Sequence, residues 1–336
     1  MMPLSKYVYS LTPTTTKQEV PILFHEPHVE TGFRKIHQPW SYYLLSLFQR
    51  HNECMNAWTH LIALLFCLAK FKSFSEEFDL INDPFMLPLV AGIMTTVMLY
   101  LCSFSAHCFH NQSELMHYTW FMIDYAGIGM YGLGCTILHY SYSLDQSLIG
   151  GILHDIAVPA AVCLAVTVCV CCSISKVMYK RPYPFTRKIW QISSVGGIYI
   201  LLIIPILQRI YLSIHDGEKW DSGLSHHTQQ ILWFLSAGFF FGSDIPQRFF
   251  PGKFDFVGHS HQIFHVCIMM TTFKKLDAVY EDIRQNRDLY QTQLPIPSFM
   301  GTIGAVLLAT LMNVIVVSIF HQLAKSKLLV ESKKKK

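Results

Sequence analysis

Two histidines stand one helical turn apart in the segment GHSHQIFHV, which runs from Gly258 to Val266. His261 and His265 are spaced i and i+4, so on a helix both imidazoles lie on the same face. A histidine pair in an apolar helix is most often a hydrogen-bonded feature of the core, and the alternative is a pair of metal ligands. The pair by itself leaves both interpretations open.

A second group of polar residues lies in another apolar run, VMLYLCSFSAHCF. This run holds Ser103 and His107, again four positions apart, and Asp124 follows in the next apolar segment, WFMIDYAGIG. Ionisable side chains are costly in hydrocarbon-compatible sequence unless they face one another or a water-filled cavity. Each of these residues is therefore a candidate functional group.

The composition indicates the surroundings of these groups. Of the 336 residues, 51% are hydrophobic and only 14% are charged, which is far more apolar than an ordinary soluble domain. A large soluble helical protein would need charged helix faces, and the apolar segments lack them. We therefore expect an all-α polytopic membrane protein. Eight segments have the length of about 20 apolar residues that a span requires: 53–71, 84–109, 116–139, 148–173, 189–213, 229–249, 256–273 and 297–322.

The predicted organisation has four parts. Residues 1–50 form a cytosolic N-terminal segment whose amphipathic patch SYYLLSLF lies in the membrane interface. Residues 51–275 form a core of seven helices, 276–322 an outer loop and an eighth transmembrane helix, and 323–336 a basic cytosolic tail. The first fifty residues carry no run that would act as a cleavable signal, so the first span must direct its own insertion.

The ten cysteines fall almost entirely inside the predicted spans, which indicates packing residues rather than disulfides. Lys and Arg are more than twice as frequent on the side of the membrane that holds the N-terminus and the tail. The positive-inside rule places that side in the cytoplasm, so both termini are predicted to be cytosolic. Lys333 and Lys334 also stand where a dilysine retrieval signal would, so plasma membrane and endoplasmic reticulum both remain open.

This topology brings the polar groups to one depth near the cytoplasmic face. His107, His261 and His265 could supply three nitrogen ligands, and three protein ligands with one open position are typical of a catalytic zinc. Asp124 has the chemistry to orient or deprotonate a water molecule, and Ser103 could hydrogen-bond that water or a substrate oxygen. The alternative for Ser103 is a hydrogen bond back to its own helix.

The first span begins with three more polar residues, Glu53, Asn56 and His60. They either extend toward lipid headgroups or form a supporting layer around the histidine cluster. Their spacing does not decide between the two.

Three motifs carry a resemblance to a known family: SLFQRHNECMNAWTHL, the Ser-x3-His pair with its downstream Asp, and DIPQRFFPGKFDFVGHSHQIFH. Together they resemble the progestin and adipoQ receptor family over about residues 20–270. The SLFQ opening, the PGKFDFVGHSHQIFHV segment and the eighth span resemble its membrane progestin receptor branch. One departure is Gln247. That branch usually has the tripeptide PER here, and a glutamine in place of its glutamate cannot form a local ion pair.

The resemblance implies a seven-transmembrane-helix bundle of the adiponectin-receptor type, with an added C-terminal helix. It implies a Zn2+ ion held by His107, His261 and His265, with Ser103 and Asp124 at the positions of the family's Ser and Asp. It also implies a membrane receptor for progestin-type steroids, with membrane lipids and a heterotrimeric G protein as partners and no nucleic acid. The alternative is a zinc-dependent, ceramidase-type amide hydrolase that acts on ceramide and releases sphingosine.

Overall fold

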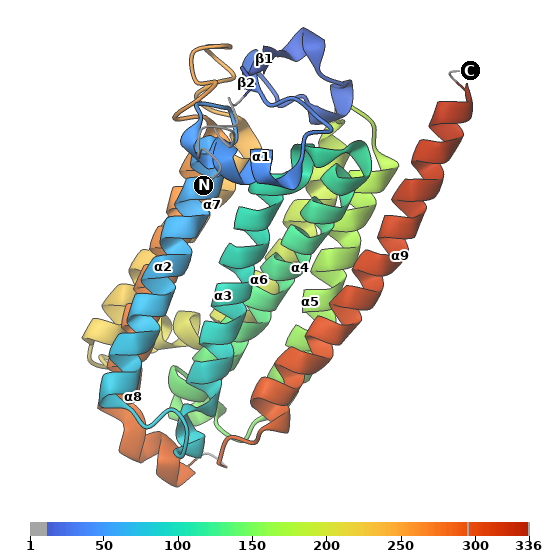
Figure 1. The fold of residues 1–336 in the computed structure, drawn as a ribbon. Helices are drawn as coiled ribbons and strands as arrows, with labels where there is room; N and C mark the ends of the chain where they lie inside the picture. The colour runs from blue at the N-terminus through green and yellow to red at the C-terminus, as the bar shows by residue number, and fades with distance from the viewer. Residues whose placement is uncertain (1–11, 294–295, 335–336) are drawn as a thin grey trace, which may run out of the picture.

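The computed structural model describes residues 12–293 and 296–334. Its long elements are helices that stand side by side as one bundle, with the N-terminal segment covering one end (Figure 1). The helices of the bundle are α2 (Cys54–Glu77), α3 (Leu87–Phe109), α4 (Glu114–Tyr142), α5 (Ile152–Met178), α6 (Phe185–His215), α7 (Ser222–Ser243), α8 (Ser260–Gln293) and α9 (Ala305–Lys334).

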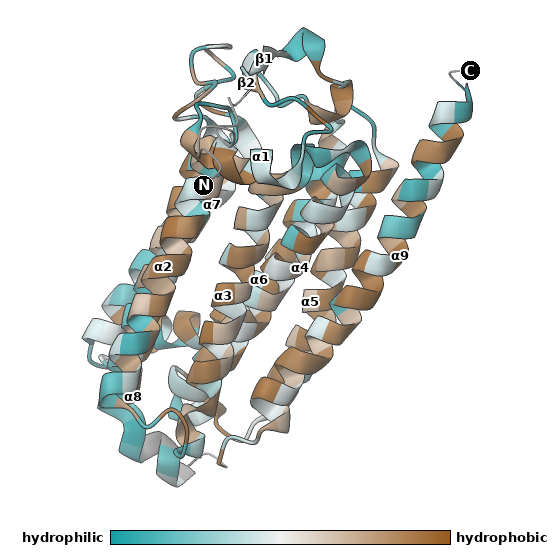
Figure 2. Cartoon of the chain, in the orientation of Figure 1, coloured by the Kyte–Doolittle hydropathy of each residue, from teal (hydrophilic) through white to brown (hydrophobic). Residues whose placement is uncertain are grey.

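Six of the described helices, α2 to α6 and α9, are long and apolar enough to cross a membrane. Figure 2 shows hydrophobic residues along the middle of the bundle and hydrophilic residues gathering toward its ends. Helices α7 and α8 are more polar, and they stand within the same bundle. The predicted all-α polytopic fold is therefore confirmed.

Small residues let neighbouring helices approach closely. At Gly134 of α4 an added methyl group would collide with the Thr95 side chain of α3, and at Gly129 it would collide with the backbone of Ala165 in α5. Such contacts are typical of membrane helices, because close packing replaces the hydrophobic driving force that water would supply. They fix α4 between α3 and α5.

Two predicted spans have different bounds in the structure. The span predicted at 229–249 corresponds to α7, which ends earlier because Asp244 adopts a left-handed backbone conformation with φ of 57°. The span predicted at 256–273 corresponds to α8, which begins at Ser260 and continues to Gln293. Much of the outer loop predicted from residue 276 is therefore helical.

The polar half of α8 continues as a helix because its charged side chains find partners on neighbouring helices. Asp277 pairs with Lys70 of α2 over 2.7 Å, and Tyr280 donates to the carboxylate of Glu77 over 2.6 Å. A hydrophobicity window ends the span where the apolar residues end, whereas these contacts let the helix extend beyond that point.

The segment predicted as a basic tail, 323–336, is helical as far as Lys334. Helix α9 follows a π-helical turn at Met300–Gly304 and runs through the described tail to Lys334. The Lys327 ammonium donates to the carbonyl of Val177, and Glu331 pairs with Lys180 over 2.8 Å. These contacts hold the basic end of α9 against the end of α5.

The N-terminal segment packs on the end of the bundle where α9 finishes (Figure 1). Strands β1 (Thr15–Thr16) and β2 (Thr31–Phe33) pair antiparallel, and α1 (Trp40–Leu45) leads into a 3-10 turn at Ser46–Phe48. Phe48 is 79% exposed in that turn, as the predicted interfacial patch requires.

Candidate metal centre

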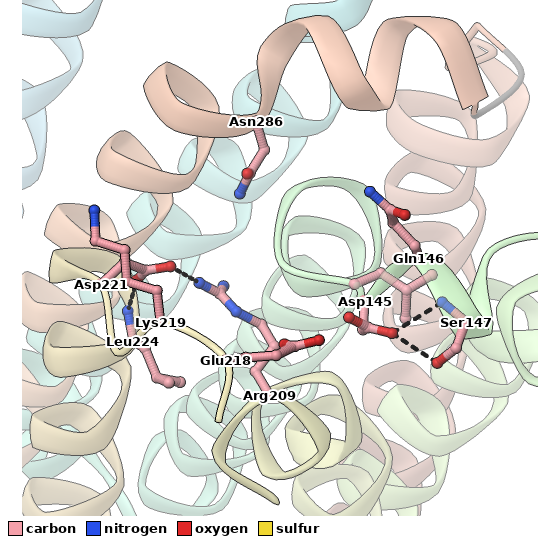
Figure 3. A pocket seen from close by; sticks show the side chains of 10 residues that line it. Asp145, Gln146, Ser147, Arg209, Glu218, Lys219, Asp221, Leu224 and Asn286 are labelled. Carbon is pink, nitrogen blue, oxygen red and sulfur yellow. Dashed lines mark hydrogen bonds and ion pairs between the residues drawn. The ribbon is translucent and has the colours of Figure 1, made fainter. Parts of the chain in front are cut away.

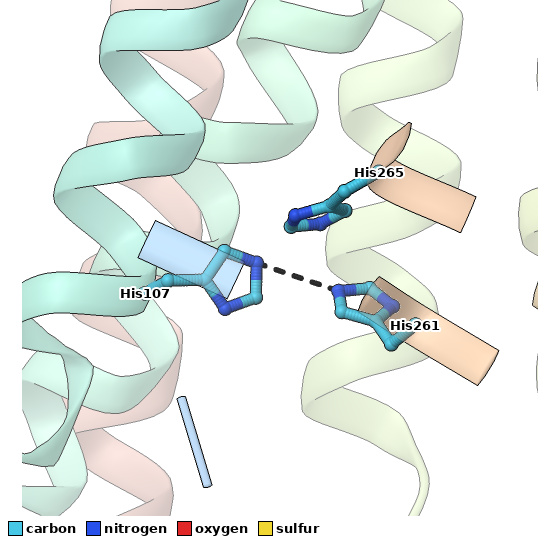
Figure 4. Close-up of side chains that lie close together, drawn as sticks. All are labelled: His107, His261 and His265. Carbon is cyan, nitrogen blue, oxygen red and sulfur yellow. Dashed lines mark hydrogen bonds between the residues drawn. The ribbon is translucent and has the colours of Figure 1, made fainter. Parts of the chain in front are cut away.

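Three histidines from two helices converge at the end of the bundle that the N-terminal segment covers. His107 lies in the last turn of α3, and His261 and His265 lie in the first turns of α8. One ligand nitrogen from each falls within 4.8 Å of the others, and Nε2 of His107 lies 3.4 Å from Nε2 of His261 (Figure 4). His107 and His265 are each 1% exposed.

His107 is oriented by a carboxylate on its far side. Its Nδ1 lies 2.7 Å from Oε2 of Glu53, the residue before α2, and Glu53 is itself 4% exposed. A histidine that gives Nδ1–H to a carboxylate presents Nε2 as its free ligand nitrogen. Glu53 is held in turn by His51, whose Nδ1 accepts the backbone N–H of Glu53 over 3.1 Å. Burial, and then the charge of Arg34, hold the pKa of His51 well below its ordinary value, so its ring can accept.

His265 is oriented by the start of α2. Its Nδ1 lies 3.2 Å from the carbonyl oxygen of Asn56 and 3.2 Å from the hydroxyl of Thr59. His60 stacks on the His265 ring, with 3.8 Å between ring centroids. With Nδ1 engaged in this way, Nε2 is the nitrogen that His265 offers to a metal.

Arg34 of the N-terminal segment completes the end of α3. Its guanidinium, with the residue 0% exposed, donates to the carbonyls of His107 over 2.7 Å and Cys108 over 2.8 Å. It also donates to Ser46 over 3.0 Å and to Oδ1 of Asn111 over 2.7 Å. The last carbonyls of a helix have no partner within it, so Arg34 satisfies them and fixes the turn that carries His107.

Asp124 and Ser103 lie beside the three histidines. Ser103 is 2% exposed and lies one turn before His107, on the same face of α3. Asp124 of α4 is 8% exposed, and its carboxylate lies near Ser103 and His107. The structure thus gathers all five predicted site residues at one end of the bundle.

Gln247 has a defined role at this end. Its side-chain amide donates to the Ser260 hydroxyl over 2.8 Å, and its carbonyl oxygen accepts the backbone N–H of Ser260 over 2.8 Å. Both bonds cap the first turn of α8, directly before His261. A neutral amide can perform this task, so no ion pair is needed there.

The structure resolves one choice that the sequence left open, and it adds a residue that the sequence did not single out. Glu53, Asn56 and His60 contact the histidines rather than the solvent, so the supporting layer is the correct interpretation. Arg34 was missed because a single arginine in a polar N-terminal segment carries no spacing signal.

The donor set fits a zinc ion. It consists of three imidazole nitrogens, from two buried rings and the half-buried ring of His261. Two of the rings are oriented by hydrogen bonds to a carboxylate or a carbonyl, which is the usual support of a zinc-binding histidine. Asp124 is a second carboxylate near these nitrogens. Unlike Glu53, it does not orient one of the histidine rings. The arrangement can therefore hold a metal and keep a proton acceptor close to it.

A second polar cluster lies at the opposite end of the bundle. Arg209 of α6 bridges Asp221, which caps α7, and Asp282 of α8, with 2.9 Å to each carboxylate. His227 also contacts Asp282 over 2.9 Å. A cavity of about 620 Å³ borders this cluster, and its walls are largely charged and polar (Figure 3). The cluster ties α6, α7 and α8 together away from the histidines.

Comparisons with known proteins agree with the motifs. The model of the family described as haemolysin-III related matches residues 48–276. The membrane progestin receptor beta of Mus musculus is 37% identical over 278 residues, which cover 82% of this chain and 78% of the relative. The receptor of the same name from Homo sapiens is 37% identical over 298 residues, which cover 88% and 84%.

A third relative, the membrane progestin receptor alpha-B of Danio rerio, is 37% identical over 280 residues, which cover 83% of this chain and 78% of the relative. The resemblance that the motifs predicted, including its branch, is confirmed by these matches.

Proposed function

The chain belongs to the haemolysin-III related family, and from that premise we propose that it is a membrane receptor for progestin-type steroids. The observation that carries the proposal is the 37% identity, over more than four fifths of the chain, to proteins named membrane progestin receptors. A multi-pass helical bundle provides the interior that an apolar ligand needs.

We further propose that His107, His261 and His265 hold one Zn2+ ion. The support is the convergence of their nitrogens within 4.8 Å and the bonds that Glu53 and Asn56 make to two of the rings. A bound zinc would supply a Lewis acid at this place. It would also link α3 to α8, so a change in metal coordination would shift both helices.

A zinc-dependent ceramidase-type hydrolase is the second candidate, and the placement of Asp124 and Ser103 favours it. Asp124 offers a carboxylate oxygen that can take a proton from an attacking water, and Ser103 offers a hydroxyl to the same water or to the amide oxygen. Both side chains are buried, so bulk water would be excluded during the reaction. The substrate would be the amide of a ceramide; water would add to its acyl carbon, the C–N bond would break, and the products would be a fatty acid and sphingosine.

The orientation in the membrane is part of the proposal. We place the N-terminal segment, the histidines and the end of α9 on the cytoplasmic side, as the distribution of Lys and Arg favours. An epitope attached after Lys336 should then become accessible to antibody only once the membrane is permeabilised. If antibody labels the epitope on intact cells, the proposed orientation is wrong and the histidines lie on the other side of the membrane. The same tag, viewed by microscopy, distinguishes the plasma membrane from the endoplasmic reticulum.

A heterotrimeric G protein is the cytosolic partner that we propose. Three basic residues near the link from α5 to α6 are engaged inside the protein: Lys180 and Arg181 between the two helices and Lys188 in the first turn of α6 all pair with acidic side chains. Recognition would therefore depend on the folded shape of this end more than on free charge. Binding of a GTP analogue to membranes, measured with and without progestin, tests this partner. If progestin does not change the amount bound, the G-protein proposal is wrong.

One experiment separates the receptor from the hydrolase. Saturable progesterone binding, the signalling response and sphingosine release are measured for the full chain and for Asp124→Asn. A receptor that signals by conformation alone should keep binding and response in the variant. A receptor that signals through sphingosine should keep binding but lose the response, because removing a general base slows hydrolysis about a hundredfold or more.

The exposed exchange Glu76→Gln on α2 is the control for expression and for handling of the membranes, and it should match the unaltered protein in all three measurements. If the unaltered chain hydrolyses ceramide and shows no saturable steroid binding, the receptor proposal is wrong and the hydrolase takes its place.

A further inference from the structure

A cavity of about 520 Å³ lies at the end of the bundle opposite the histidines. It lies where α3 begins, α4 ends, α5 begins and the chain enters α9. The residues that define it include Phe85, Tyr140, Ser141, His154, Ile296 and Thr302. Its volume falls within the range of about 300–1,000 Å³ that is typical of sites for small molecules.

The walls of this cavity are mostly carbon. Pro84, Phe85, Ile296 and Pro297 contribute rings and an aliphatic side chain, and the ring of Tyr140 is 2% exposed. None of the described residues that line it carries a cationic side chain. A phosphate headgroup would find no counter-charge there, whereas an uncharged apolar ligand would find matching walls.

Polar side chains also stand in these walls: Asp83, which pairs with Arg287, and Ser141, His154, Gln291, Ser298 and Thr302. Two of them bear on the choice of ligand. The Nδ1 atom of His154 is buried and has no hydrogen-bond partner within the described residues. Its nearest acidic atom, Oδ1 of Asp155, is 3.5 Å away, which is too long for a good hydrogen bond. Ser141 contributes a hydroxyl. A buried polar atom without a partner is costly, and a ligand oxygen would satisfy it.

The rim of the cavity is apolar and exposed. Ile296 is 76% exposed, Met300 75% and Phe299 52%, just before α9 begins. The same stretch contains the π-helical turn at Met300–Gly304, and π-helical turns occur often at functional sites. Placed in a membrane, this exposed apolar rim would let a lipid-dissolved ligand reach the cavity without crossing bulk water.

We propose that this cavity is the steroid site of the receptor, an inference that rests on the proposed function. The ring skeleton of a progestin lies against Phe85 and the prolines, and one of its ketone oxygens accepts a hydrogen bond from His154 or Ser141. The cavity beside Arg209 is less suited to such a ligand, because its walls are mostly polar and a steroid there would desolvate the charges that Arg209 pairs with. The ligand site and the histidine centre then stand at opposite ends of the bundle.

The test is saturable binding of tritiated progesterone to membranes that contain the full chain. His154→Phe keeps a ring of similar size and removes the donor, and it should weaken binding about tenfold. Ser141→Phe fills the cavity and should abolish saturable binding. The matched controls are His215→Phe, at the exposed end of α6, and Ser318→Phe, on the exposed face of α9, both outside the lining. Both controls should bind progesterone as the unaltered chain does.

Expression and the size-exclusion profile establish that each variant is folded. If folded His154→Phe and Ser141→Phe both bind progesterone with unaltered affinity, the cavity is not the steroid site, while the receptor proposal stands. If the unaltered chain binds no progesterone, the receptor proposal itself fails, and this inference fails with it. Loss of binding in both variants, with both controls intact, supports the site.

Discussion

The Nδ1 atom of His107 lies 2.7 Å from Oε2 of Glu53, and both side chains are almost completely buried. Glu53 stands directly before α2, whereas His107 stands in the last turn of α3. The contact therefore joins two helices at the point where a third, α8, brings His261 and His265. A ring fixed on one nitrogen in this way has its other nitrogen directed at the centre.

We expect the purified protein to contain one zinc ion per chain. His261→Ala or His265→Ala should lose much of this metal, and the double variant should lose nearly all of it, because one histidine cannot hold zinc alone. Metal analysis by mass spectrometry of the purified protein measures the occupancy. The exposed His215→Ala is the control. Full occupancy in the double variant would refute the proposed ligand set.

Glu53→Gln should lower the affinity for zinc about 10- to 100-fold, which is the usual effect of altering a group that orients a metal ligand. The amide can still accept the N–H of His107, but it lacks the negative charge that makes the ring a stronger ligand. Competition with a chelator of known affinity measures the change. The exposed Glu76→Gln at the other end of α2 should leave the affinity unchanged. Equal affinities for the two variants would contradict the role of Glu53.

Arg34→Ala should lower the melting temperature and the zinc content together, because the carbonyls of His107 and Cys108 lose their donor. Each unsatisfied buried group costs about 1–3 kcal/mol. Arg34→Lys should rescue little, since one ammonium cannot reproduce the fork of the guanidinium.

The control for Arg34 is its exposed neighbour Lys35, changed to Ala. Thermal unfolding followed in detergent, with metal analysis on the same sample, measures both effects. An Arg34→Ala protein as stable and as zinc-rich as the control would show that the N-terminal segment does not support the site.

Asp282→Asn should destabilise the protein by about 3–5 kcal/mol, because it leaves the charge of Arg209 less well balanced at a buried position. The zinc content of the folded protein should not change, since this pair lies at the other end of the bundle. Denaturation measurements compare it with Lys72→Ala. Lys72 pairs with Glu76 on the surface, where such a pair is worth about 0–1 kcal/mol. If both variants lose a similar amount of unfolding free energy, the Arg209 cluster does not stabilise the packing of α6, α7 and α8.

Much of the fold was predictable because it depends on local features of the chain. The length of each apolar run predicted the helices of the bundle, and the i, i+4 spacing placed His261 and His265 on one face. The prediction failed at α8, which extends to Gln293 through charged residues that pair with α2. A hydrophobicity pattern contains no information about such partners.

The sequence by itself determined the kinds of residue at the site and the helices that carry them, because helical period and apolar length are properties of neighbouring residues. Only the tertiary structure decided that Glu53 meets His107 and that Arg34 closes the end of α3. These pairs are separated by more than fifty positions in the chain, so they form only where helix packing brings the backbones together. A buried hydrogen bond requires the two atoms to meet within about 3 Å, and that is a property of the packed bundle alone.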